Sequence, residues 1–243
     1  MDKVVFKNVY MKYDGAGDYS LTDISFSVED GETVGVIGGT GSGKTTLVSM
    51  IPGFYKAESG EILISGKNVR DYDEKELKRK VGFCFQKYYL FHGNIRDNVK
   101  FGAPEAGNDD IIEALKIAQG YDFVMQKKKG LMEPVSEKGA NFSGGQKQRL
   151  MIARALVRKP EILILDDSSS ALDFATDKKL RMAISELKNT TTFIVSQRVS
   201  SIIHSDKILV LDDGKLVGKG THEELLNNNL IYREIYESQT KDK

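Results

Sequence analysis

A glycine-rich segment between an apolar run and an amphipathic run constrains the fold of this chain more than any other feature. The run TVGVIG, residues 33–38, has the β-branched composition of a buried strand, and TLVSMI, residues 46–51, continues in a helical pattern. Between them, GGTGSGKTT matches the phosphate-binding P-loop both in residue types and in its strand–loop–helix context. The segment therefore predicts an α/β fold organised around a phosphate site.

Each residue type in this loop has a chemical reason to be there. Glycines let the backbone turn its N–H groups inward around phosphate oxygens, and the following helix adds the positive end of its dipole. Lys44 is expected to bridge the β- and γ-phosphates of a nucleotide, and the Thr45 hydroxyl is expected to ligate Mg²⁺. The nucleotide-binding candidates in the loop are Gly38, Gly39, Thr40, Gly41, Ser42, Gly43, Lys44, Thr45 and Thr46.

A second apolar strand supplies a partner for the metal ion. EILILD, residues 161–166, ends in Asp166, and a carboxylate at the end of a buried strand beside a P-loop is placed to hold Mg²⁺ through water. Asp166 is therefore predicted to be the Walker B aspartate.

Short apolar runs recur along the chain and indicate a mixed sheet with helices on its faces. Asp213 and Gly214 separate two such runs, which predicts a hairpin and an antiparallel part of the sheet. Between Gln86 and Pro160 the apolar spacing changes to about 3.6 residues, which predicts helices, one of them over DDIIEALKIAQGYDFVM, residues 109–125. The expected fold is a P-loop NTPase (RecA-like) α/β core with an antiparallel β subdomain, formed by residues 1–86 and 158–243, and an inserted helical subdomain, residues 87–157.

Composition excludes several other classes of protein. The chain has 35 Lys and Arg against 35 Asp and Glu, so it has no overall basic field to attract nucleic acid. Its single cysteine, Cys84, excludes an internal disulfide and fits a reducing compartment, and within VGFCFQ it is expected to be a small buried apolar residue. No signal peptide is expected at the N-terminus, and no apolar run approaches the roughly 20 residues that span a bilayer. A membrane span, if there is one, must come from another polypeptide or segment.

The segment NFSGGQKQRLMIARAL resembles the signature motif of the ATP-binding cassette (ABC) family. Ser143 can cap the helix that follows, while Gly144 and Gly145 expose backbone N–H groups ahead of Gln146, which together make an anion site. In the family this site closes on the γ-phosphate that another subunit holds.

The resemblance continues along nearly the whole chain. It implies that Tyr13 stacks on adenine, with Tyr10 as a rival, and that Gln86 senses Mg²⁺ and the attacking water while its loop contacts transmembrane domains. Asp173 matches the D-loop, and Glu137 lies in a segment similar to the X-loop of exporters. The segments LFHGNIRDNV and GTHEELL also resemble exporters more than importers.

Two positions depart from the family pattern. Asp167 stands where the family carries the glutamate that acts as general base, and one missing methylene moves the carboxylate by about 1 Å, which can cost about 10²-fold in rate. Gln197 stands where the family carries its switch histidine; a glutamine can donate a hydrogen bond to phosphate but cannot take on a proton near neutral pH. Together they predict a site that holds ATP and turns it over slowly.

The resemblance implies an ATPase that uses ATP and Mg²⁺ and works at the cytoplasmic face of the cell membrane. The combination is similar to one half of a heterodimeric exporter: Lys44, Asp166, Asp167 and Gln197 would form an impaired site, while the intact signature would complete the partner's site. Two alternatives stay open, namely a homodimeric ATPase subunit and a soluble ABC ATPase or regulatory module without a membrane partner.

Overall fold

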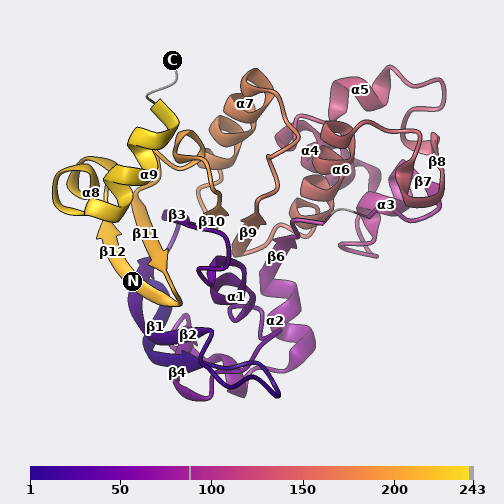
Figure 1. The fold of residues 1–243 in the computed structure, drawn as a ribbon. Helices are drawn as coiled ribbons and strands as arrows, with labels where there is room; N and C mark the ends of the chain where they lie inside the picture. The colour runs from indigo at the N-terminus through magenta and orange to yellow at the C-terminus, as the bar shows by residue number, and fades with distance from the viewer. Residues whose placement is uncertain (88, 241–243) are drawn as a thin grey trace. The chain divides into compact units, whose positions relative to one another are not determined.

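A computed structural model of the protein describes residues 1–87 and 89–240. The chain forms two compact units, one made of Met1–Val81 with Asn189–Lys243 and the other of Gly82–Lys188 (Figure 1). The first unit carries the P-loop and the second carries the signature motif, so each unit contains part of the predicted chemistry.

One sheet of the first unit is antiparallel, as the sequence predicts. Its strand order is β2 (Leu21–Glu29), β1 (Asp2–Met11), β4 (Ser59–Ile64) and β5 (Lys67–Asn68). Buried and exposed residues alternate along β2, which is the pattern of a sheet with one face on the core. Phe6 and Phe26 lie opposite each other on neighbouring strands and stack at 4.6 Å.

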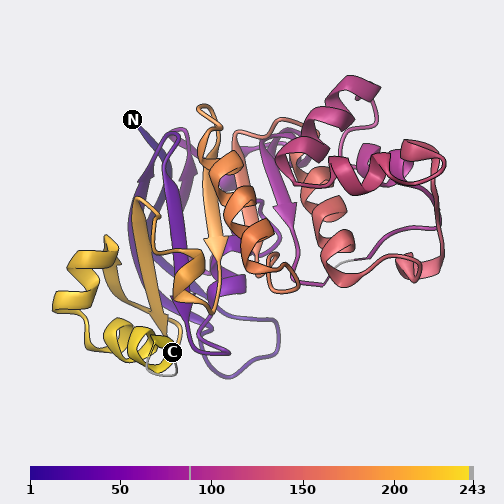
Figure 2. The ribbon, with the colours of Figure 1, turned by 90° about the horizontal axis from the view of Figure 1, so that it is seen from above.

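The P-loop strand β3 (Thr33–Gly38) has a parallel neighbour on each side, β10 (Thr191–Val195) and β11 (Lys207–Asp212). A strand that is covered on both faces reads as a continuous apolar run, which explains the VGVI sequence of β3. Helix α1 (Lys44–Ser49) follows the loop. Helices α8 (His222–Asn228) and α9 (Leu230–Thr240), the yellow helices of Figures 1 and 2, pack against this sheet through one apolar cluster that includes Ile37, Val210, Leu225 and Tyr232.

The predicted hairpin is confirmed. Strand β12 (Lys215–Gly220) pairs antiparallel with β11, and Asp212 lies opposite Lys215. Asp213 and Gly214 between them have φ values of 43° and 72°. Positive φ at both central residues defines a type I′ turn, whose twist matches that of the flanking strands. The first unit also contains η1 (Val69–Asp71), α2 (Glu74–Lys80) and η4 (Val199–Ser201).

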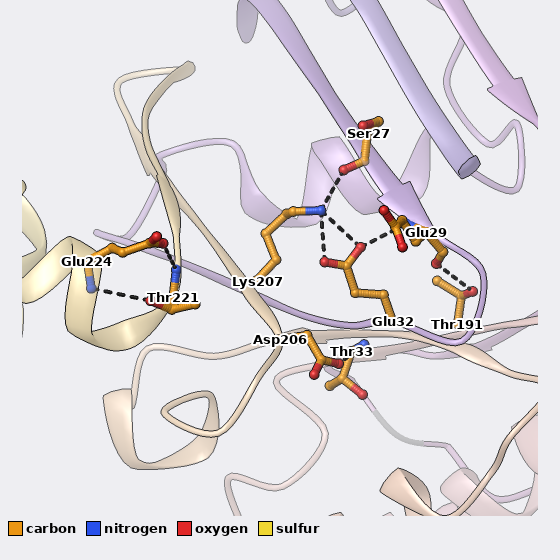
Figure 3. A network of polar contacts seen from close by, with 9 residues as sticks. All are labelled: Ser27, Glu29, Glu32, Thr33, Thr191, Asp206, Lys207, Thr221 and Glu224. Carbon is orange, nitrogen blue, oxygen red and sulfur yellow. Dashed lines mark hydrogen bonds and ion pairs between the residues drawn. The ribbon is translucent and has the colours of Figure 1, made fainter. Parts of the chain in front are cut away.

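A polar cluster ties the N-terminal ends of β3 and β11 together (Figure 3). The Lys207 ammonium lies 2.8 and 2.9 Å from the two carboxylate oxygens of Glu32, and it also donates to the carbonyl of Ser27 at 2.9 Å. Beside it, the Thr33 amide donates to the Asp206 carboxylate at 2.8 Å. These contacts fix the start of the strand that ends in the P-loop.

The second unit is mainly helical. Its large apolar cluster runs from Cys84 to Ile184. The predicted signature helix is confirmed as α6 (Gly144–Leu156), whereas the helix expected over residues 109–125 is broken in two. The elements are β6 (Val81–Cys84), β7 (Gly93–Asn94), α3 (Ile95–Lys100), α4 (Asn108–Ile117), α5 (Tyr121–Met125), η2 (Gly130–Met132), β8 (Pro134–Val135), η3 (Glu137–Gly139), α6, β9 (Ile162–Asp166) and α7 (Phe174–Ser185).

The break between α4 and α5 has a local cause. Gln119 adopts φ 57°, and the Gly120 amide donates to the Leu115 carbonyl at 2.7 Å, which is the closure of a Schellman-type C-cap. Across residues 1–87 and 89–240, no helix has the length and apolar character that a membrane crossing needs.

Candidate nucleotide-binding site

The P-loop backbone leaves room only for glycine at its two ends. Gly38 ends β3 at φ 156°, and a Cβ there would lie 2.1 Å from the Leu211 carbonyl oxygen. Gly43 caps α1 at φ 96°, and a Cβ there would lie 2.7 Å from the Leu21 side chain. Glycine is therefore needed at both positions for two reasons: a neighbouring group lies where a Cβ would be, and the backbone has a positive φ.

Lys44 is held inside the loop that it follows. Its ammonium donates to the carbonyls of Gly38 at 2.9 Å and Gly39 at 2.6 Å, and to the Ser42 hydroxyl at 3.3 Å. The residue is 8% exposed. A partly desolvated cation interacts with an anion more strongly than one in water, so this arrangement fits a polyphosphate.

A cavity of about 570 Å³ lies beside the P-loop and is lined by Gly41, Gly43, Thr45 and Tyr13 among others. The Tyr13 hydroxyl lies 2.7 Å from the Thr46 hydroxyl, and its ring meets Tyr55 edge-on at 5.1 Å. The rival Tyr10 instead packs edge-on against Tyr19. Of the two candidate tyrosines, Tyr13 thus lines this cavity, and its stacking on adenine stays a prediction.

The second unit brings the Q-loop glutamine and the short carboxylate together. Asp166 ends β9 and is 2% exposed. Asp167 follows with φ 44°, in the left-handed region that Asp enters more readily than most residues. The Gln86 amide nitrogen lies 3.3 Å from a carboxylate oxygen of Asp167 and donates to it. A water molecule beside this pair could accept from the amide and donate to the carboxylate.

The signature segment forms the N-terminus of α6, and the predicted cap at Ser143 is confirmed. The Ser143 hydroxyl accepts from the Gln146 amide at 3.3 Å, while the Gln146 side chain accepts from the Ser143 amide at 3.1 Å. This capping box uses two of the backbone donors at the helix start. The N–H groups of Gly144 and Gly145 lie between these two residues.

Sequence reasoning missed a residue of the same helix, Gln148, which is 1% exposed. Its side-chain nitrogen lies 3.2 Å from the Ser170 hydroxyl, and its oxygen accepts from the Ala171 amide at 3.0 Å. Gln148 therefore joins the signature helix to the loop between Asp167 and Asp173. In the sequence, a run of three serines, residues 168–170, indicated this loop but not its contact with Gln148.

Two environments in the second unit shift pKa values. Hydrogen bonds from the Thr176 amide and hydroxyl lower the pKa of Asp173, which caps α7. Burial raises the pKa of Cys84 to about 12, against a hydrogen bond with Ser168 that favours the thiolate. The thiol of Cys84 is therefore an unreactive core group, as its apolar sequence context predicts.

The candidate residues divide between the two units. Tyr13, the P-loop and Gln197 belong to the first unit, whereas Gln86, Asp166, Asp167 and the Ser143–Gln146 segment belong to the second. The Mg²⁺ candidates are Thr45, Gln86 and Asp166. Within the described ranges, no three His, Cys, Asp or Glu residues gather where a metal ion could sit.

The sheet, the glycine loop and its buried lysine define a nucleotide-binding domain of the P-loop NTPase class. The family model described as ABC transporter matches residues 21–170. The chain therefore belongs to the ABC transporter family and is an ATP-binding domain of it, and such domains are ATPases. The predicted fold class and family are confirmed.

Curated relatives are similar along nearly the whole chain. An uncharacterized ABC transporter ATP-binding protein of Bacillus subtilis, YfiB, is 43% identical over 98% of this chain. A putative multidrug export ATP-binding/permease protein of the same organism, YgaD, is 42% identical over 97% of it. The solved structure of a bacterial Atm1-family ABC exporter with ATP bound superposes with a TM-score of 0.94 at 34% identity, over 98% of this chain and 42% of that one. This chain spans 41% of the length of each of the two relatives.

Proposed function

We propose that this chain is the ATP-binding motor domain of an exporter and that it pairs with a second, non-identical ATP-binding domain. Its own ATP site, with Asp167 and Gln197, holds MgATP and cleaves it slowly. Its intact signature segment completes the ATP site of the partner, where most turnover takes place. Transmembrane domains, contacted through the loop after Gln86, place the assembly at the cytoplasmic face of the membrane.

The observation that carries this proposal is the carboxylate of Asp167 at 3.3 Å from the Gln86 amide. The group that should activate water is present, but it is one methylene shorter than the glutamate found at this position in the family. A carboxylate that stops about 1 Å short can lose about 10²-fold in rate. Gln197 adds a second loss, because a neutral amide makes a weaker contact with phosphate than an imidazolium does.

The signature segment supports the other half of the proposal. Ser143 and Gln146 form a complete capping box, so the helix start is ordered and its glycine amides keep a fixed direction. A rigid set of N–H donors suits the γ-phosphate of an ATP that another subunit holds. An intact signature beside an impaired base is the expected division of labour in a two-site dimer with unlike sites.

The test restores both family residues in the assembled transporter. We expect the Asp167→Glu, Gln197→His double variant to cleave γ-phosphate at this site at least about tenfold faster in a single turnover, because reach and a chargeable donor return. The matched control is Asp167→Asn with Gln197→His, which should give no gain. If the double variant is no faster than the native protein, the impaired-site reading is wrong.

A homodimer remains the rival because Asp167 keeps a carboxylate within reach of Gln86. That arrangement requires fast multiple-turnover hydrolysis by the purified chain alone. We expect the isolated chain to bind MgATP and to hydrolyse it very slowly, and Lys44→Ala to abolish binding. Turnover of many ATP molecules per second by the lone chain would favour the homodimer.

A further inference from the structure

The side chain of Gln239, near the end of α9, holds the loop that carries Gln197. Its amide nitrogen donates to the Gln197 carbonyl at 2.7 Å, and its amide oxygen accepts from the Val199 amide at 2.9 Å. One primary amide thus bonds two backbone groups on either side of Arg198. Of the common side chains, only Asn and Gln carry a donor and an acceptor in this arrangement.

Helix α9 is held in place by buried contacts. Tyr232 on α9 is fully buried, and its hydroxyl lies 2.8 Å from the His222 ring. The apolar cluster that holds Tyr232 also contains Ile37 of β3 and Val199 itself. The amide of Gln239 is therefore fixed relative to the strand that ends in the P-loop.

The loop itself is anchored at its other end by the sheet. The Ser196 amide donates to the Val36 carbonyl at 3.1 Å, and the Arg198 amide donates to the Ser196 hydroxyl at 3.0 Å. Gln197 is exposed between Ser196 and the pair of bonds from Gln239. The direction in which its side chain leaves the backbone therefore depends on both anchors.

We propose that Gln239 is a positioning residue for the γ-phosphate contact that Gln197 makes. The inference rests on the proposed function, in which Gln197 occupies the switch position. A neutral amide has no charge to compensate for a poorly aimed hydrogen bond, so it needs an accurately placed backbone. Gln239 supplies that placement from α9.

The experiment compares ATP with ADP, because only ATP presents a γ-phosphate. Affinities of the purified chain for ADP and for a non-hydrolysable ATP analogue are measured by titration calorimetry. Gln239→Leu should lower the affinity for the ATP analogue about fivefold, which is the usual effect of losing one neutral hydrogen bond. It should change the affinity for ADP by less than about twofold. Ser238→Ala is the matched control: its hydroxyl donates only to the Ile235 carbonyl of the same helix in the described contacts, and both affinities should stay as in the native chain.

A second variant separates the two bonds. Gln239→Glu keeps an oxygen for the Val199 amide but places another oxygen against the Gln197 carbonyl. Hydrogen exchange should show the Val199 amide still protected in this variant, and exposed in Gln239→Leu. The preference for the ATP analogue should nevertheless fall in both variants.

Combination with Gln197→Ala shows whether Gln239 acts through Gln197. The double variant Gln197→Ala, Gln239→Leu should bind the ATP analogue no more weakly than Gln197→Ala alone. Additive losses, or equal losses for ATP and ADP, would overturn the positioning role. If Gln197→Ala lowers the ATP preference and Gln239→Leu does not, the inference fails alone; if Gln197→Ala also has no effect, the switch role in the proposed function fails with it.

Discussion

Removing the carboxylate of Glu32 should destabilise the first unit without changing how it binds ATP. In Glu32→Ala the Lys207 ammonium loses both carboxylate oxygens and keeps the Ser27 carbonyl, and the Glu29 amide loses its acceptor at 2.8 Å. The side chains of Glu32 and Lys207 are 13% and 26% exposed. Exposed pairs contribute about 0–1 kcal/mol, and breaking a buried pair costs about 3–5 kcal/mol. Because this pair is partly buried, we expect Glu32→Ala to lower the free energy of unfolding by an intermediate amount, about 2–3 kcal/mol.

The assay is thermal unfolding followed by circular dichroism, with ATP affinity measured in parallel. A loss of this size lowers Tm by about 5–10 °C in a chain of this length. The Kd for ATP should change less than about twofold, because the pair lies at the start of β3 and the P-loop at its end, about 20 Å along the strand. The double variant Glu32→Leu, Lys207→Met should recover much of the stability, since no unpaired charge remains.

The control is Glu74→Ala, which breaks an i,i+4 pair with Lys78 whose side chains are 79% and 51% exposed. It should leave Tm unchanged within error, because water replaces such a contact. If Glu32→Ala behaves like this control, the polar cluster at the strand starts does not stabilise the sheet and the reasoning is refuted.

Three further predictions use other parts of the chain. In the assembled transporter, Asp167→Asn should lower steady-state ATPase only a few-fold, within about 1 kcal/mol of barrier, whereas Ser143→Arg should nearly abolish it; equal losses would indicate a homodimer. Gly38→Ala should prevent ATP binding in a titration, because its Cβ would lie 2.1 Å from the Leu211 carbonyl. Burial lowers the pKa of His222, so the unfolded chain binds a proton that the folded chain rejects just below pH 6.5. The urea midpoint should therefore fall as pH drops from 7.5 to 5.5, and His222→Gln should reduce that fall.

Features written in short stretches of sequence were predictable. The P-loop, the Asp213–Gly214 hairpin and the Ser143 cap each depend on residues within a few positions of one another, so local chemistry determines them. The family resemblance added functional assignments for Gln86 and Asp167, but only the structure places these two side chains 3.3 Å apart.

Contacts between distant residues were not predictable. Gln148 meets Ala171, and Gln239 meets Gln197 across 42 positions; no periodic pattern marks a polar side chain that bonds a remote backbone. The break at Gln119 was missed for another reason. The helical spacing of apolar residues in the segment 109–125 continues through Gly120. A single glycine inside such a pattern is compatible with a continuous helix as well as with a C-cap.

The order of strands around β3 has a consequence for how the protein is made. Both neighbours of the P-loop strand, β10 and β11, are synthesised well after it. About 150 residues must be added before β10 appears, which takes on the order of 10–30 s at about 5–20 residues per second. During that time the edges of β3 are unpaired. A nascent chain therefore cannot complete the sheet that carries its phosphate loop until β10 and β11 have been synthesised.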